Sequence, residues 1–250
     1  MEQMIGIIGG VGPYAGLDVV KKIFDNTVAS CDQDHLDLHL INIPSKIGDR
    51  TDYLLNGGTN PAYALIQGFD QLVKVGATVV GIPCNTAHAP AIFNVLARHV
   101  AKAYPAVILL NMIEETCSQI IDRYPDGVRI GLLATKGTHA VGLYSSYFRH
   151  YAKLELLEPS IEDREIVHGA IYDPGYGIKA VTPVSAKAVA ILVDQANKLI
   201  DRGAEVIILG CTELPLALHE GLVACPLVDP TLVLARAAIQ HAAPEKLRQY

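Results

Sequence analysis

Short apolar runs alternate with segments of helical periodicity along the chain. Some of these runs are almost uninterrupted, such as Thr78–Pro83 and Glu205–Gly210, which is typical of strands buried on both faces of a parallel sheet. Seven segments of this kind predict strands: Ile5–Gly9, Leu36–Asn42, Thr78–Pro83, Val107–Asn111, Arg129–Ala134, Lys153–Leu157 and Glu205–Gly210.

Between the strands, apolar residues recur at the spacing of one helix face. The segments that predict helices most clearly are Pro61–Val75, Asn94–Tyr104, Ala186–Arg202 and Pro230–Ala243. Strands that alternate with helices in this way predict a doubly wound α/β fold.

The two halves of the chain resemble each other. After a predicted helix, a Gly-Ala pair, a strand and a cysteine follow one another from Gly76 to Cys84 and again, 127 residues later, from Gly203 to Cys211. A chance repetition of strand–helix units would not repeat the cysteine as well. We therefore expect two similar α/β domains, one made of residues 1–112 plus 229–250 and the other of residues 113–228.

Composition narrows the class of protein. Half of the 250 residues are hydrophobic, 18% are charged and the net charge is −6, which favours a globular protein and argues against nucleic-acid binding. No apolar run reaches the roughly 18 residues that would cross a bilayer. The first residues lack a basic region and a cleavage site, so we expect no signal peptide, no membrane partner and a cytoplasmic location.

Two cysteines carry the candidate chemistry. Cys84 lies in Gly-Ile-Pro-Cys-Asn-Thr-Ala-His, and Cys211 lies in Leu-Gly-Cys-Thr-Glu-Leu. Both follow a predicted strand, so both are expected at the carboxyl ends of parallel strands, where open α/β sheets bind ligands. We also expect each to lie near a helix N-terminus that favours a thiolate, with Asn85, Thr86 and Thr212 capping that helix or binding a carboxylate.

Two thiols suit the inversion of a carbon stereocentre. One base removes a proton from one face, and an acid on the other face returns one. Other interpretations are weaker. A lone cysteine after a strand is usually a core residue, Cys84 and His88 would supply only two zinc ligands, and a Cys84–Cys211 disulfide would need tight closure. The five cysteines include no Cys-x-x-Cys pair, so no disulfide framework is expected.

Three other signals leave alternatives open. The segment from Gly10 to Ala15 fits a dinucleotide-binding fingerprint, but the following strand has its acidic residue, Asp37, at its beginning instead of its end. His88 either polarises Cys84 or makes structural hydrogen bonds. Glu213 either tunes Cys211 or stabilises a helix N-terminus, and its position just after a strand favours the second interpretation.

These motifs resemble the aspartate/glutamate racemase family, and its aspartate racemase branch in particular. The matching segments are Gly6–Pro13, Pro83–His88, Gly131–Thr138 and Gly210–Glu213. The resemblance implies two doubly wound α/β domains with parallel four-stranded sheets, related by pseudo-twofold symmetry, with the active site in the cleft between them. It also implies a homodimer that acts on an amino acid without pyridoxal phosphate, any other cofactor or a metal.

The resemblance also assigns residues. Cys84 and Cys211 become the acid/base pair, and the residues that hold the substrate become Gly12, Arg50, Asn85, Thr86, Thr135, Thr138, Lys179 and Thr212. An arginine and a lysine would suit a dicarboxylic amino acid such as aspartate or glutamate.

The chain departs from the family pattern in three places. Val11 stands where methionine is common, Gly48 stands where proline is common, and the segment Ile166–Val184 is long and rich in tyrosine. The alternatives to an amino-acid racemase are therefore an isomerase or lyase of a related dicarboxylate, of the maleate isomerase kind, and a protein that binds an acidic metabolite without converting it.

Overall fold

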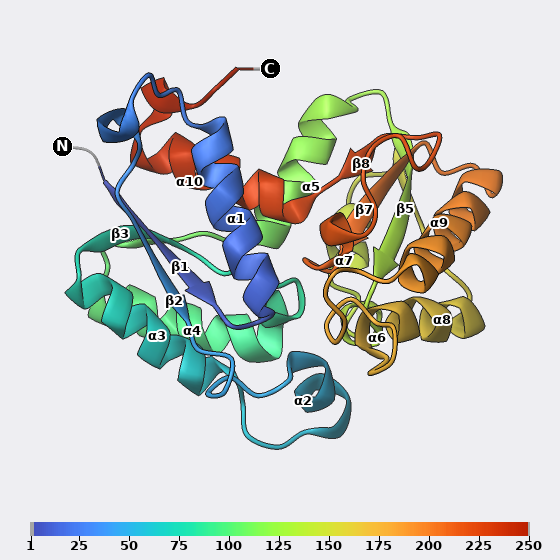
Figure 1. Ribbon diagram of the computed structural model, residues 1–250, viewed down its shortest axis with the longest axis horizontal. Coiled ribbons are helices and arrows are strands. Elements are labelled where there is room, and N and C mark those ends of the chain that lie inside the picture. Colours follow the sequence, from blue (N-terminus) through green and yellow to red (C-terminus); the bar gives the residue numbers. More distant parts are fainter. Residues whose placement is uncertain (1–2, 250) are drawn as a thin grey trace. The chain divides into compact units, whose positions relative to one another are not determined.

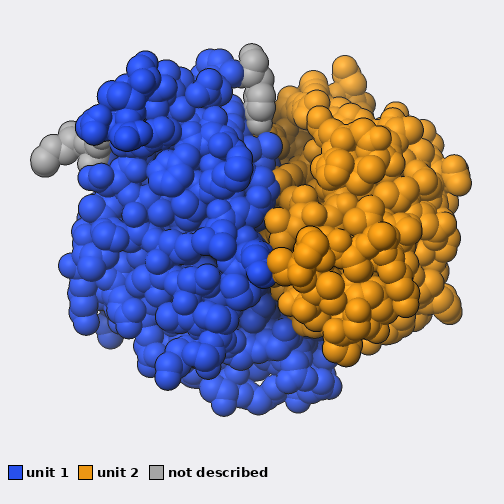
Figure 2. Space-filling view, viewed as in Figure 1, with its two compact units in different colours: residues 1–115, 231–250 blue, residues 116–230 orange. Residues whose placement is uncertain are grey.

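The computed structural model describes residues 3–249 and divides the chain into two compact units. Unit 1 contains residues 1–115 and 231–250, and unit 2 contains residues 116–230. Figure 2 colours them separately. Each unit is built on its own parallel sheet of four strands flanked by helices, so the predicted α/β class is confirmed.

Unit 1 has the strand order β2-β1-β3-β4. Its strands are β1 (Met4–Gly9), β2 (Leu38–Asn42), β3 (Ala77–Gly81) and β4 (Ile108–Leu109). Its helices are α1 (Pro13–Asn26), α2 (Arg50–Asn56), α3 (Ala62–Lys74), α4 (Pro90–Ala103) and, near the C-terminus, α10 (Pro230–Ala242). Helix α5 (Met112–Arg123) begins in unit 1 and continues into unit 2.

Alternate residues of the strands of unit 1 enter two separate cores. Ile7 and Val79 pack with α1 and α10 on one face of the sheet, and Ile8 and Val80 pack with α3 and α4 on the other. Figure 1 shows these two helix pairs on opposite faces. The central strands β1 and β3 are apolar at nearly every position because both of their faces are covered.

Unit 2 repeats this plan, with the strand order β6-β5-β7-β8. Its strands are β5 (Val128–Ala134), β6 (Leu154–Leu157), β7 (Val206–Gly210) and β8 (Leu227–Val228). Its helices are α6 (Lys136–Ala140), α7 (Ser145–Phe148), α8 (Ile161–Tyr172) and α9 (Ala186–Asp201). β5 is therefore the counterpart of β1, and β7 the counterpart of β3.

All seven predicted strands are present, with ends shifted by a few residues. The eighth strand, β8, was not predicted because Pro226 and Asp229 limit its apolar run to two residues, whereas β4, equally short, lies within the longer run Val107–Leu110. Helix α4 begins at Pro90, four residues before the predicted Asn94, and proline suits this first helical position. Within the part of the chain that the structure describes, no helix is long and apolar enough to cross a membrane.

Candidate active site

In both units, most of the predicted site residues lie just after the carboxyl ends of the strands. β5 pairs in parallel with β7, with Ala134 opposite Gly210. Thr135 and Cys211, the next residue on each strand, therefore start their loops side by side. In unit 1, β1 pairs with β3, with Ile7 opposite Gly81, so the glycine turn and the Cys84 loop leave the same edge of that sheet.

Cys84 lies in a buried loop directly after β3. Its side chain is 4% exposed, and its Sγ lies 3.4 Å from the hydroxyl oxygen of Thr86. Asn85 and Thr86 are also buried. The hydroxyl is a hydrogen-bond donor that can stabilise a sulfur anion.

His88 is bound to the backbone through both ring nitrogens. Its Nδ1 lies 2.8 Å from the carbonyl oxygen of Cys84 and donates to it, and its Nε2 accepts the N–H of Met112 at 3.2 Å. Burial lowers the pKa of His88 to about 4, against the opposing effect of the hydrogen bonds with Cys84 and Leu110. The imidazole is therefore neutral, and the structural interpretation of His88 is the one that its contacts favour.

This environment makes stability depend on pH. In the unfolded chain His88 takes up a proton near its ordinary pKa of 6.5, whereas the folded imidazole stays neutral until about pH 4. The unfolded state binds more protons in this window, so stability falls as pH falls through it, by up to about 3 kcal/mol. The stability difference between the wild type and His88→Gln should shrink by that amount between about pH 7 and about pH 4.

Urea unfolding at the two pH values measures this difference. The matched control is His150→Gln, because His150 is exposed and lies outside the core. Equal pH dependence in the wild type and His88→Gln would contradict the neutral, buried assignment.

Arg50 ties the start of α2 to the glycine turn after β1. Its Nη1 donates to the carbonyl oxygen of Gly48 at 3.1 Å, and its Nη2 donates to that of Val11 at 2.9 Å. The arginine is 6% exposed. Gly12 is the N-cap of α1, so the first N–H groups of a 14-residue helix begin beside this turn, where an anion would be favoured.

Cys211 lies in unit 2 beside a buried carboxylate. Its thiol donates to Oε2 of Glu213 at 3.1 Å, and the hydroxyl of Thr212 lies 3.5 Å from the same oxygen. Burial raises the pKa of Cys211 well above its usual value, the negative charge of Glu213 adds to this, and Lys179 partly opposes it. Cys211 is therefore a thiol, not a thiolate.

Lys179 forms an ion pair with Oε1 of Glu213. Burial disfavours its charge, but Glu213, Cys211 and Tyr172 outweigh that effect and raise the pKa of Lys179. The ammonium also lies 5.5 Å from the centre of the Tyr172 ring. The predicted substrate-binding cation thus already has a carboxylate partner.

Thr135 and Thr138 form the turn that follows β5. Thr135 is the N-cap of α6, and its hydroxyl accepts the N–H of Thr138 and lies 3.2 Å from the Thr138 hydroxyl. Both threonines are buried, and the β5–β7 pairing brings them to the same sheet edge as Cys211.

The helix N-terminus predicted near each cysteine is that of a short 3₁₀ turn, and no α-helix begins directly after either cysteine. A three-residue 3₁₀ turn follows each cysteine, at Thr86–His88 and at Leu214–Leu216. In the first loop, Ala89 is extended because it precedes Pro90, and α4 starts only there. In the second, the 3₁₀ turn ends at Leu216 and no α-helix follows before β8.

The proposed capping roles fail for the same reason. Asn85 makes no side-chain cap hydrogen bond, and Thr212 bonds to Glu213 instead. Glu213 precedes only a three-residue 3₁₀ turn, and its carboxylate binds Lys179 and the Cys211 thiol, so its interpretation as a tuning residue replaces the one that the sequence favoured. Tyr172 interacts with Lys179 and belongs to the tyrosine-rich segment Ile166–Val184, but no role of its own was predicted for it. Tyr144, which interacts with Cys211, was not predicted, because it belongs to no repeated motif.

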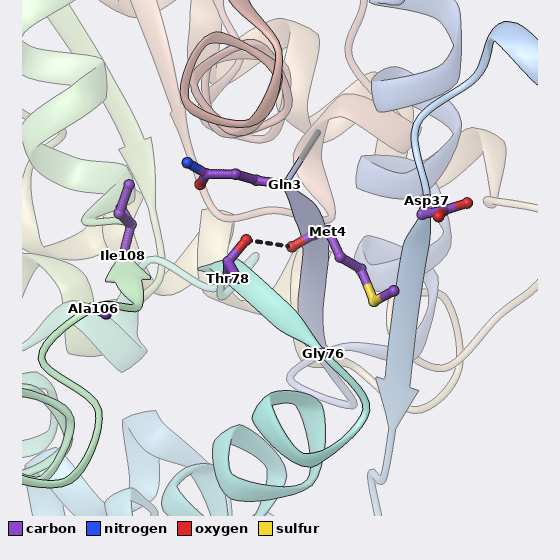
Figure 3. Close-up of a pocket in the computed structure, with 7 residues that line it drawn as sticks. All are labelled: Gln3, Met4, Asp37, Gly76, Thr78, Ala106 and Ile108. Atoms are coloured by element: carbon purple, nitrogen blue, oxygen red, sulfur yellow. Dashed lines mark hydrogen bonds between the residues drawn. The ribbon is translucent and has the colours of Figure 1, made fainter. Parts of the chain in front are cut away.

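Unit 1 also has a surface pocket of about 580 Å³ at the opposite edge of its sheet. Figure 3 shows its lining residues, Gln3, Met4, Asp37, Gly76, Thr78, Ala106 and Ile108. They belong mainly to the amino ends of the strands, whereas Cys84 follows a carboxyl end. The pocket is therefore not part of the candidate site.

Two further observations concern metals and disulfides. Among residues 3–249, no group of three or more His, Cys, Asp or Glu side chains could hold a metal ion. All five cysteines are free. Cys84 and Cys211 are thus both available as thiols.

Comparison with known proteins gives a consistent set of relatives. The family model described as Asp/Glu/Hydantoin racemase matches residues 8–238. A broad specificity amino-acid racemase of Bacillus subtilis (strain 168) is 24% identical over 245 residues, which cover 94% of this chain and 96% of that protein.

Solved structures of an aspartate racemase and of an aspartate racemase homologue are also similar to this chain. An aspartate racemase from Picrophilus torridus aligns with a TM-score of 0.81 at 29% identity, over 96% of this chain and 94% of that one. An aspartate racemase homologue from Pyrococcus horikoshii OT3 aligns with a TM-score of 0.71 at 26% identity, over 97% of this chain and 100% of that one.

Proposed function

Because this chain belongs to the Asp/Glu/Hydantoin racemase family and is therefore an isomerase, we propose that it racemises an acidic amino acid, aspartate first, without a cofactor. In this proposal Cys84 and Cys211 are the two acid/base residues. The similarity to an aspartate racemase supports aspartate as the first substrate, and the similarity to a broad specificity racemase supports testing other amino acids.

The equivalence of the two cysteines carries the proposal. Cys84 follows β3 and Cys211 follows β7, and these strands hold the same place in two sheets of the same order. A binding protein has no need for a second thiol at the equivalent position. A reaction that moves one proton off a carbon and another onto its opposite face needs two.

The proposed reaction has two proton transfers. The thiolate of one cysteine takes the α-proton, and the C–H electron pair stays on the α-carbon next to the carboxylate. The thiol of the other cysteine then gives its proton to the opposite face, and its S–H electron pair stays on sulfur. The enzyme is left with the two protonation states exchanged, ready for the reverse reaction.

The remaining site residues are proposed to hold the substrate. N–H groups beside Gly12 and the hydroxyls and amide of Thr86, Asn85, Thr135, Thr138 and Thr212 would bind the α-carboxylate and the amino group. Stabilising charge on the carboxylate lowers the energy of the carbanion-like intermediate. Arg50 and Lys179 are the cations proposed to bind the side-chain carboxylate of the substrate. We also propose that the enzyme is a cytoplasmic homodimer, and light scattering would measure its oligomeric state.

A panel of L-amino acids tests the proposal, with chiral chromatography as the readout and no added cofactor. We expect D-aspartate or D-glutamate to form, together with incorporation of deuterium at the α-carbon in D₂O. If maleate is isomerised while no amino acid in the panel changes configuration, the protein is a related dicarboxylate isomerase. Tight binding of aspartate with neither inversion nor deuterium exchange would indicate a binding protein.

A further inference from the structure

The two thiols have different surroundings. The Cys84 sulfur lies near a hydroxyl group, that of Thr86. The Cys211 sulfur donates to a carboxylate, that of Glu213, 3.1 Å away. A thiolate beside a buried carboxylate is disfavoured by two like charges, whereas a thiol is favoured because it can donate.

Glu213 itself is held in place by unit 2. It is 3% exposed, and its two oxygens have separate partners: Oε1 binds Lys179 and Oε2 binds the Cys211 thiol. A buried carboxylate stays ionised only when a cation or several donors compensate it. Lys179 supplies that cation, and the Tyr172 ring lies against the ammonium.

We propose that Glu213 is a positioning residue that keeps Cys211 protonated in the resting enzyme, with Lys179 as the cation that pairs with the Glu213 carboxylate. The proposal rests on the two-thiol function proposed above. It makes the two cysteines inequivalent before substrate binds: Cys211 is the resting acid, and Cys84 is the partner that starts as the base.

The same arrangement limits how long a thiolate persists at position 211. When Cys211 gives its proton to the substrate carbon, the S–H electron pair remains on a sulfur that faces Glu213. Repulsion from the carboxylate favours recapture of a proton, and the nearby ammonium of Lys179 offsets part of that repulsion. Lys179 therefore serves Cys211 through Glu213, besides any contact with substrate.

Tyr144, one of the described residues, also interacts electrostatically with Cys211. The phenol of Tyr144 is fully buried, and burial, together with Cys117, Asp229 and Cys211, raises the pKa of Tyr144 well above its usual value. Tyr144 is therefore neutral over the working range. Among the described residues, the charged groups that we propose to control the protonation of Cys211 are therefore Glu213 and Lys179.

The test is the pH dependence of Cys211 alkylation by iodoacetamide, followed peptide by peptide with mass spectrometry. Glu213→Gln keeps the size of the side chain and removes its charge. We expect the midpoint of the alkylation profile to fall by at least about one pH unit, and the rate at about pH 8 to rise about tenfold. Glu205→Gln is the matched control, because Glu205 also pairs with a cation, Arg129, but at an exposed site.

A structural role for Glu213 predicts something different. A loosened loop would raise the alkylation rate at every pH and leave the midpoint where it is, and that result would overturn the proposal. In the racemase assay, Glu213→Gln should also move the alkaline limb of the kcat/KM profile to lower pH, since that limb reports the essential acid of the free enzyme. Glu213→Asp, which restores the charge, should move both profiles back toward the wild type.

The two proposals can fail separately. If Glu213→Gln shifts the Cys211 midpoint but no amino acid is racemised, the control of the thiol stands and the function does not. If amino acids are racemised while the midpoint is unchanged, the function stands and the role of Glu213 is wrong.

Discussion

Cys84→Ala and Cys211→Ala should each lower the racemisation rate of the accepted amino acid by at least about a thousandfold. Each cysteine is proposed to perform one of two obligatory proton transfers, and such transfers contribute roughly 10²- to 10⁴-fold each. Alanine removes the transferring group altogether. The measurement is kcat/KM in both directions by chiral chromatography, with circular dichroism to verify the fold.

Conservative and control variants sharpen this test. Cys84→Ser and Cys211→Ser keep nearly the same size but are far weaker acids, so they should be almost as inactive as the alanine variants. Cys31→Ser changes an exposed cysteine outside the candidate site and should retain the wild-type rate. Wild-type rates in both alanine variants would rule out the two-thiol mechanism.

Gly10→Ala should lower the free energy of unfolding by about 3 kcal/mol or more. Gly10 has φ of +87°, a conformation that L-residues rarely adopt. A Cβ there would also lie 2.7 Å from the backbone nitrogen of Pro44 and 2.8 Å from backbone atoms of Ile43. The overlap is with main chain, which cannot rotate away, so the glycine turn or the loop after β2 must move.

The control for Gly10→Ala is Gly57→Ala. Gly57 has φ of +82°, but a Cβ there would meet nothing within 4 Å. With ψ of −157° as well, Gly57 is in a region that is essentially restricted to glycine, so this variant should show the conformational cost alone, about 1–3 kcal/mol, without the main-chain overlap. The midpoint of thermal unfolding of Gly10→Ala should be roughly 6–12 °C lower than that of the wild type. If both variants lose the same free energy of unfolding, the structure relieves the backbone overlap at Gly10 without an energetic cost, and the prediction is wrong.

A shift of this turn should also affect catalysis. Arg50 donates to the carbonyl oxygen of Val11, next to Gly10, so movement of the turn displaces the guanidinium that is proposed to bind substrate. We expect Gly10→Ala to lose activity at temperatures where it is still folded, whereas Gly57→Ala should keep it.

Local patterns in the sequence were sufficient to predict the strands, the alternation of strands and helices, and the two cysteine motifs. Apolar periodicity and the 127-residue repeat are properties of neighbouring residues and of order along the chain. They place Cys84 and Cys211 after the same strand of two similar sheets, because a buried parallel strand can be recognised from its own residues. β8 and the short turns after the cysteines lacked such a signal.

The charge state of the candidate groups was decided by tertiary structure. Lys179 binds Glu213, which is 34 positions away in the sequence, and His88 accepts the N–H of Met112, which is 24 positions away. No local pattern encodes these pairings. Burial and a specific partner set whether a thiol, carboxylate or imidazole is charged, and both depend on which distant segments the fold packs together. The sequence by itself therefore determined which strand each of the two thiols follows, and only the folded chain determined that the Cys211 thiol donates to the Glu213 carboxylate.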